Sequence, residues 1–171
     1  HNAFLVHDDV EDGSEHRRGK PTMHAEHGVP IAVNVGDAMN VLSIRPLMEN
    51  LQNLGPALTW AVFVEIEHMV RQAVEGQALE LGWVRDNNCD MKEDDYLRMT
   101  LKKTCWYTCI QPCRIGALIA TQGEADLDRF NRFGYYMGAA FQIQDDLLNL
   151  LGDRKKYGKE IGGYIWEGKR T

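Results

Sequence analysis

Residues 124–153 read EADLDRFNRFGYYMGAAFQIQDDLLNLLGD, and their pattern decides the fold class. Apolar side chains recur near the 3.6-residue period of an α-helix, so one face of the predicted helix is apolar. Gly152 ends the pattern, as a glycine often does just after the last helical turn. The stretch therefore predicts one long amphipathic helix. Its apolar face consists of Leu127, Phe130, Phe133, Met137, Phe141 and Leu148.

The same spacing recurs in three earlier stretches. Residues 29–44, 59–81 and 96–120 have helical periodicity, and the last is interrupted at Pro112, because proline removes a helical hydrogen bond. The apolar face of residues 59–81 consists of Val62, Ile66, Met69, Val70, Ala73 and Leu79. No turn residues lie between alternating apolar runs, so strands have no support. The sequence predicts an all-α bundle of long helices.

The composition is that of an ordinary globular domain. A chain of 171 residues, 44% hydrophobic and 26% charged, is long enough to form one domain with its own core. The net charge of -6 argues against a nucleic acid as the partner. No apolar run reaches the ~20 residues of a membrane-spanning helix, and no signal peptide is visible. Four cysteines without evident pairing are typical of a reducing compartment, so we expect a cytoplasmic protein.

Two acidic clusters lie far apart on predicted helices. Each has two residues four positions apart, which share one helical face, and an aspartate next to the first of them. The clusters consist of Asp8, Asp9 and Asp12, and of Asp145, Asp146 and Asn149. Clustered carboxylates repel each other unless a cation intervenes, and oxygen ligands without Cys or His favour Mg²⁺ or Mn²⁺. Two facing clusters would grip a diphosphate through bridging metal ions; the alternative is that each run is a solvated helix face.

Basic residues gather in three places although the chain is acidic overall. Together they are suited to contact phosphate oxygens, whereas any one of them alone is typical of a solvated surface. They are Arg17, Arg18 and Lys20 after the first acidic cluster, Lys102 and Lys103 before Thr104, and Lys155, Lys156, Lys159 and Lys169 after the second cluster.

Five motifs follow one another along the chain. They are HDDVEDGSEHRRGKPTMH (7–24), EGQALEL (75–81), LKKTCWY (101–107), FQIQDDLLNLLGD (141–153) and YGKEIGGYIWEGKRT (157–171). In this order they resemble the first aspartate-rich motif with its arginine pair, the Gly-Gln motif, the Lys-Thr element, the second aspartate-rich motif and the late lysine loop of the trans-isoprenyl diphosphate synthases. That family includes the farnesyl and geranylgeranyl diphosphate synthases. The resemblance spans almost the whole chain.

The resemblance implies a fold of isoprenoid synthase type, in which long, mostly antiparallel helices surround a central cavity. It implies Mg²⁺ as the cofactor, with three ions per site and Mn²⁺ as a substitute. The implied metal-binding residues are Asp8, Asp9, Asp12, Asp145, Asp146 and Asn149. The implied contacts are Arg17, Lys103, Lys159 and Lys169 for the allylic diphosphate, and His1 and Arg18 for isopentenyl diphosphate. The implied catalytic residues, beside the reacting carbons and the departing diphosphate, are Lys103, Thr104, Gln142 and Lys159.

The implied reaction joins an allylic diphosphate to isopentenyl diphosphate, head to tail. Breaking the allylic C–O bond gives a carbocation and diphosphate, whose negative charge metal ions and lysines stabilise. Ala3 and Phe4 lie just before Asp8, where residues of the family limit product length. One small and one aromatic residue favour a geranylgeranyl product, with farnesyl as the next candidate.

Three positions depart from the family pattern. Asn149, Tyr164 and Glu80 stand where aspartates are usual. The upstream basic motif and the C-terminal helices of the family are not found between His1 and Thr171. We therefore expect residues 1–171 to be a single synthase domain that forms the core fragment of a longer chain.

Two other functions stay open. A class I terpene cyclase also ionises prenyl diphosphates with Mg²⁺, but it lacks the arginine pair and the second aspartate pair. A regulatory subunit of a heteromeric synthase would keep the bundle and lose metal ligands; the intact aspartates argue against it, while Tyr164 leaves room for it. The resemblance also implies a homodimer, for which residues 29–44 are a candidate surface.

Three cysteines recur every four residues at Cys105, Cys109 and Cys113. On a continuous helix they would share one face, which would suit either a metal site or tight helix packing. No fourth ligand is evident, so the spacing favours packing.

Overall fold

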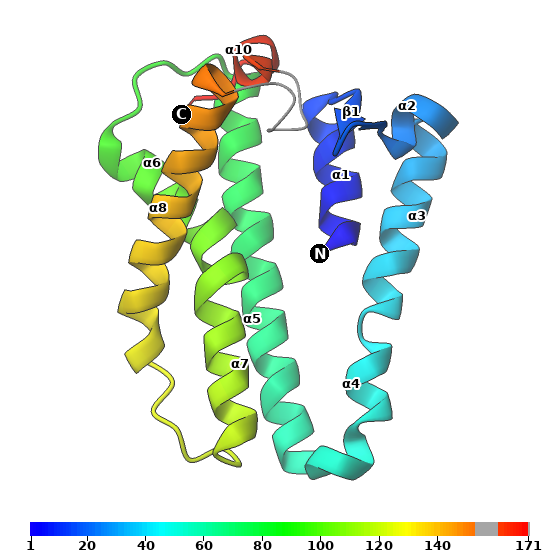
Figure 1. The fold of residues 1–171 in the computed structure, drawn as a ribbon, viewed down its shortest axis with the longest axis vertical. Helices are drawn as coiled ribbons and strands as arrows, with labels where there is room; N and C mark the ends of the chain where they lie inside the picture. The colour runs from blue at the N-terminus through cyan, green and yellow to red at the C-terminus, as the bar shows by residue number, and fades with distance from the viewer. Residues whose placement is uncertain (153–160, 171) are drawn as a thin grey trace. The chain divides into compact units, whose positions relative to one another are not determined.

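The computed structural model describes residues 1–152 and 161–170. Helices dominate these residues and confirm the predicted all-α class (Figure 1). They are α1 (Asn2–Asp12), α2 (Met23–His27), α3 (Val29–Leu42), α4 (Arg45–Glu49), α5 (Leu51–Arg85), α6 (Glu93–Thr100), the π-helix η1 (Leu101–Ile110), α7 (Gln111–Ala120), α8 (Arg129–Leu151) and α10 (Gly163–Glu167). Contacts divide the chain into two compact units, His1–Pro46 with Asp146–Lys169 and Leu47–Asp145 with Arg170.

In the first unit α1 packs against α2 and α3. His7 joins α1 to α3, because its Nε2 lies 3.3 Å from the Val33 carbonyl oxygen and 3.4 Å from the Asp37 carboxylate. Gly13 ends α1 in the left-handed conformation, and its N–H donates to the Val10 carbonyl. These contacts fix the helix that carries the first acidic cluster.

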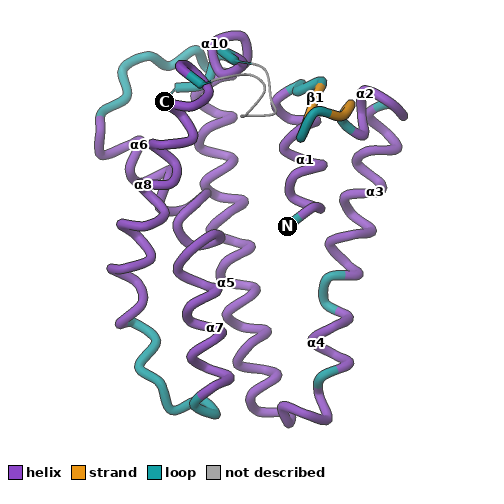
Figure 2. Tube along the Cα trace, in the orientation of Figure 1, coloured by secondary structure: helices purple, strands orange, loops and turns teal. Residues whose placement is uncertain are grey.

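A short antiparallel ladder follows α1. Its strands are β1 (His16–Arg17) and β2 (Lys20–Pro21), and Figure 2 shows the region in orange. The prediction that the chain has no strands was wrong here. Arg18 and Gly19 have φ of 54° and 75°, and positive φ at both central residues is what a two-residue type I′ hairpin turn requires. The turn sets the ladder without any alternating apolar pattern, which is why the pattern did not reveal it.

The core of the second unit is built on α5. Its helical geometry is broken at Gly55, and Pro56 follows, where its fixed φ suits the first turn of the next helical stretch. Val62 is buried against Leu118 of α7. The predicted helix over residues 59–81 is confirmed, although Val70 of its expected apolar face is exposed.

The elements α6, η1 and α7 follow one another without a gap. Pro112 lies in the first turn of α7, where its missing N–H is tolerated. The predicted interruption is therefore a change of helical register and not a break. The Gln111 N–H donates to the carbonyl of Trp106, five residues earlier, as in a π-helix. Lys103 and Thr104 lie within this π-helix, and π-geometry is rare and frequently found at functional sites.

Small residues of α8 make its closest contacts. A Cβ at Gly134 would lie 2.6 Å from Ile110, and one at Gly138 would lie 2.6 Å from Cys105. The predicted apolar face was wrong for four of its six members, because such a close approach to η1 leaves no room for large side chains. Phe133, Met137, Phe141 and Leu148 are exposed, whereas Leu127 and Phe130 are partly buried.

Across residues 1–152 and 161–170, none of the helices combines the length and the apolar character needed to cross a bilayer.

Candidate active site

The first acidic cluster is held in place by Arg17. Its Nε donates to both carboxylate oxygens of Asp9, at 2.7 and 2.8 Å, and its Nη2 donates to Asp8 Oδ2 at 3.0 Å. Burial lowers the pKa of Arg17, but the contacts with Asp9 and Asp8 outweigh it and raise that pKa above its ordinary value. Asp9 is buried, so it anchors the guanidinium, while Asp8 is only partly buried.

The third member of this cluster, Asp12, pairs with Lys169. The Lys169 Nζ lies 2.6 Å from Asp12 Oδ2 and 3.3 Å from Glu167 Oε2. The side chains of Lys169 and Asp12 are only 6% and 4% exposed, so this is a nearly buried ion pair. Ser14 Oγ also donates to Glu167 Oε1 at 3.4 Å. The C-terminal segment of the first unit is thus tied to the end of α1.

The second acidic cluster lies at the end of α8. Asp145 is partly buried, whereas Asp146 and Asn149 are buried. The Asn149 Oδ1 accepts a hydrogen bond from the Tyr164 backbone N–H at 3.1 Å, and the Asn149 carbonyl accepts one from the Gly162 N–H at 2.7 Å. The amide oxygen that was predicted to support a metal ion therefore has a protein donor.

The second unit holds the Lys-Thr element of η1. Lys103 Nζ lies 2.5 Å from Glu80 Oε2 of α5, and Thr104 Oγ1 donates to Gln142 Oε1 of α8 at 2.6 Å. Thr104 and Gln142, which were predicted to act together, are thus in contact. A Cβ at Gly76 would lie 2.4 Å from the Lys103 backbone nitrogen, so α5 approaches η1 closely at this point.

The remaining predicted site residues lie as follows. His1 and Arg18 are exposed, Phe4 is partly buried, and Ala3 is buried with 5% exposure. Lys159 lies outside the described residues. Asp8, Asp12 and Lys169 belong to the first unit, whereas Lys103, Thr104, Gln142 and Asp145 belong to the second.

The donor chemistry of α1 fits a hard divalent cation. Asp8 and Asp12 each already hold a cationic side chain, which shows that positive charge is stabilised at both carboxylates. Over the described ranges 1–152 and 161–170, no three acidic, His or Cys side chains converge as a ready-made metal cage. Mg²⁺ does not require one, since one or two carboxylates, waters and substrate phosphates usually complete its shell. Asp8 and Asp12 are therefore the residues of the first unit that would hold it.

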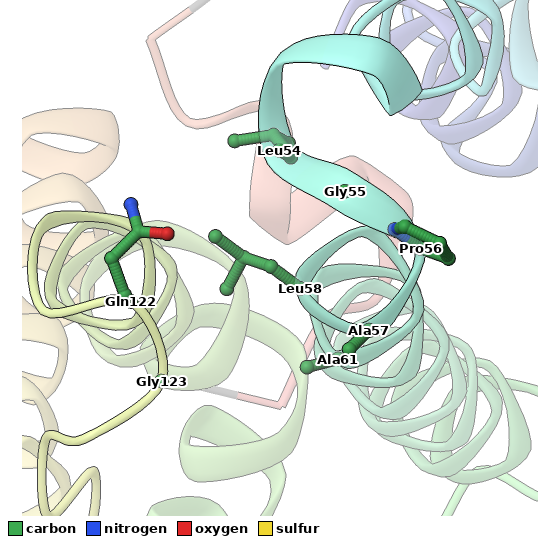
Figure 3. Close-up of a pocket in the computed structure, with 8 residues that line it drawn as sticks. All are labelled: Leu54, Gly55, Pro56, Ala57, Leu58, Ala61, Gln122 and Gly123. Carbon is green, nitrogen blue, oxygen red and sulfur yellow. The ribbon is translucent and has the colours of Figure 1, made fainter.

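A shallow hollow of about 320 Å³ lies at the kink of α5, but it does not suit a diphosphate. Leu54, Leu58 and Ala61 line it together with the amide of Gln122, as Figure 3 shows. None of the residues that line it is charged, so it offers no partner for phosphate oxygens.

Three site contacts were not predicted from the sequence. Glu80 pairs with Lys103, and Ser14 and Glu167 extend the Asp12–Lys169 pair. The Glu80–Lys103 and Ser14–Glu167 contacts join residues that are 23 and 153 positions apart in the chain, which no local pattern reports. Gly76 carried a signal, because a glycine inside an amphipathic helix often marks a close approach of another backbone.

A mostly helical scaffold with acidic clusters, arginines and lysines of this kind is typical of one class of proteins, those of the isoprenoid synthase fold. Solved structures agree. The geranylgeranyl pyrophosphate synthase of Corynebacterium glutamicum, complexed with isoprenyl diphosphate and magnesium, matches 99% of this chain and 51% of its own, with a TM-score of 0.86 and 30% identity.

The family follows from the sequence comparisons. The family model described as Polyprenyl synthetase matches residues 1–171, and the chain belongs to this family. It is 36% identical over 171 residues to the geranylgeranyl diphosphate synthase of Sulfolobus acidocaldarius, covering 100% of this chain and 51% of the relative. It is 34% identical over 171 residues to the short chain isoprenyl diphosphate synthase of Methanocaldococcus jannaschii, covering 100% of this chain and 50% of the relative. The chain spans about half the length of these curated relatives.

Proposed function

We propose that the intact protein is a trans-prenyltransferase that condenses an allylic diphosphate with isopentenyl diphosphate. The observation that carries the proposal is the cluster on α1, where Asp8 and Asp12 lie one turn apart and each binds a cationic side chain. Family membership supports the same reaction. We further propose three Mg²⁺ ions per site, replaceable by Mn²⁺.

The chain's own residues would act at three places. When bound, Mg²⁺ supplies positive charge that promotes cleavage of the allylic C–O bond. Arg17, Lys103 and Lys169 stabilise the negative charge on the departing diphosphate. Thr104 and Gln142 present neutral polar oxygens, held together by their hydrogen bond, beside the delocalised cation. The double bond of isopentenyl diphosphate attacks this cation, and the proton that is then lost passes to the departing diphosphate.

Several parts of the chain contribute residues to the proposed site. We assign Asp8, Asp9 and Asp12, with Asp145, Asp146 and Asn149, to the metal ions, His1 and Arg18 to isopentenyl diphosphate, and Lys159 to the allylic diphosphate.

Turnover distinguishes this proposal from its two alternatives. The intact gene product should incorporate labelled isopentenyl diphosphate into an acid-labile prenyl diphosphate with Mg²⁺, and EDTA should abolish incorporation. A cyclic hydrocarbon as the product would instead identify a terpene cyclase. Turnover that appears only with a second, different chain would identify a regulatory subunit.

The product is proposed to be geranylgeranyl diphosphate, with farnesyl diphosphate as the second candidate. Ala3 is buried and Phe4 is partly buried on α1, one turn before the acidic cluster, so both are suited to limit a growing tail. The relative from Sulfolobus acidocaldarius carries the name of a geranylgeranyl diphosphate synthase.

Phe4→Ala tests the length assignment. Removing the ring should lengthen the main product by at least one isoprene unit, because the tail meets less bulk on α1. The products are separated by chromatography after dephosphorylation. Phe133→Ala, which removes an exposed ring from α8, is the control and should leave product length unchanged. A Phe4→Ala product of unchanged length would contradict the assignment.

We also propose a cytoplasmic homodimer. The stretch from α3 to the turn after it exposes several apolar side chains, some of which a second copy would cover. They are Val29, Ile31, Val33, Val41, Leu42 and Ile44. Light scattering should give twice the mass of one chain, and Val41→Asp should lower that mass. A wild-type protein that is monomeric at micromolar concentration would contradict the proposal.

A further inference from the structure

Two departures from the family pattern, Asn149 and Tyr164, are in direct contact. Asn149 is 2% exposed and Tyr164 is 7% exposed. The Asn149 Oδ1 accepts the Tyr164 N–H at 3.1 Å, so the neutral amide serves as an acceptor for the backbone at the start of α10. A buried N–H that lacks such a partner would cost about 1–3 kcal/mol. The Asn149 side chain and the Tyr164 backbone are therefore structurally linked.

Tyr164 also determines where Lys169 lies. Gly168 adopts a left-handed conformation with φ of 68°, and its N–H donates to the Ile165 carbonyl. The Lys169 N–H donates to the Tyr164 carbonyl at 2.9 Å, which completes a Schellman motif at the end of α10. The backbone of Tyr164 is thus bonded on one side to Asn149 and on the other to Lys169.

The aromatic ring of Tyr164 adds a third contact. The Lys169 Nζ lies 4.6 Å from the centroid of this ring, within the range of a cation–π interaction. The same ammonium contacts Asp12 and Glu167. A nearly buried ammonium needs such partners, because burying a charge without partners costs much free energy. The ring face therefore helps to keep a charged lysine at the end of α1.

We propose that Tyr164 and Asn149 are positioning residues for Lys169. Asn149 fixes the start of α10, Tyr164 carries the ammonium of Lys169 on its ring, and Lys169 is thereby held beside Asp12, where the diphosphate arrives. The inference rests on the proposed function for the role of Lys169. It gives Asn149 this positioning role in addition to its proposed place in the second acidic cluster.

The contact between Lys169 and the Tyr164 ring is tested by acetylating lysines with a succinimidyl ester. The rates are measured by peptide mass spectrometry on the intact protein, without metal or substrate. In the wild type Lys169 should react at least about tenfold more slowly than the exposed Lys92, which serves as the internal reference. Tyr164→Leu should raise the relative rate of Lys169 roughly threefold to thirtyfold. Tyr164→Phe keeps the ring face and should stay within about twofold of the wild type.

A matched pair tests the amide. Asn149→Asp retains an acceptor for the Tyr164 N–H and should keep Lys169 protected, whereas Asn149→Leu removes the acceptor and should expose it. Equal Lys169 rates in Tyr164→Leu and Tyr164→Phe would overturn the role of the ring. Equal rates in the two Asn149 variants would overturn the role of the amide. If the leucine variants do not fold, a wild-type Lys169 that reacts as fast as Lys92 still refutes the inference.

Calorimetry of inorganic pyrophosphate binding with Mg²⁺ tests whether the contact between Lys169 and Tyr164 affects diphosphate binding. Tyr164→Leu should weaken this binding at least about fivefold, and Tyr164→Phe should restore it. The labelling result is independent of turnover. A protein that shows the expected labelling but no prenyl transfer would refute the proposed function alone. One that transfers prenyl groups while the Leu and Phe variants bind pyrophosphate equally would refute the positioning role alone.

Discussion

At the scale of single residues, the carboxylates of α1 stay close together because cationic side chains offset their repulsion. Arg17 makes three hydrogen bonds to Asp9 and Asp8, and Lys169 pairs with Asp12. The sequence identified all five residues as site candidates. It did not reveal which cation serves which carboxylate, because that depends on the hairpin turn after α1 and on the cap of α10.

Arg17→Lys should weaken the cluster, because an ammonium cannot replace a guanidinium that contacts two carboxylates. We expect a loss of about 1–3 kcal/mol in the free energy of unfolding, measured by urea denaturation. Arg85→Lys is the control, because Arg85 also donates two hydrogen bonds to a carboxylate, that of Asp86, but on an exposed surface. It should not change stability measurably. Equal effects of the two substitutions would contradict the structural role of Arg17.

Cys105 should be unreactive in the folded protein. It is fully buried, and burial raises the pKa of its thiol to about 12, so the reactive thiolate stays scarce at neutral and mildly alkaline pH. Cys89 is exposed. Iodoacetamide at about pH 8 should therefore alkylate Cys89 at least a hundredfold faster, as followed by peptide mass spectrometry, and the difference should vanish in denaturant. Similar rates in the native state would contradict the burial.

At the scale of elements, the contact between α5 and η1 sets the position of the Lys-Thr element. Periodicity predicted helices on both sides of this contact, since burying one face requires apolar residues at helical spacing. It did not predict the π-geometry, because a π-turn depends on hydrogen bonds to the fifth residue back and leaves no mark on the apolar pattern. It also misplaced the packed face of α8, where small residues such as Gly138 approach η1.

Gly76→Ala should disturb this contact, because the new methyl group would overlap the backbone of Lys103. We expect a loss of about 1–3 kcal/mol in unfolding free energy and a marked fall in prenyl transfer. Gly82→Ala lies on the same helix with no neighbouring atom within 4 Å, so it should stabilise the protein by about 0.5–1 kcal/mol. A Gly76→Ala protein as stable and active as the wild type would contradict the close approach.

At the scale of the whole molecule, the order of motifs carried most of the functional information. The helical class and the family followed from patterns that are local in sequence. The pairs that organise the site are not local, as the 157-residue separation of Asp12 and Lys169 shows. Such pairs arise only when helices pack, and a single sequence does not encode them in any local pattern.

We propose that the α1 carboxylates bind the metal ions that ionise an allylic diphosphate. The test compares Asp12→Asn with Asp90→Asn, a matched change at an exposed position, in Mg²⁺-dependent incorporation of isopentenyl diphosphate by the intact protein. We predict that Asp12→Asn lowers incorporation by at least about a hundredfold and that Asp90→Asn leaves it unchanged. Incorporation by Asp12→Asn at the wild-type rate and the wild-type Mg²⁺ requirement would contradict the account.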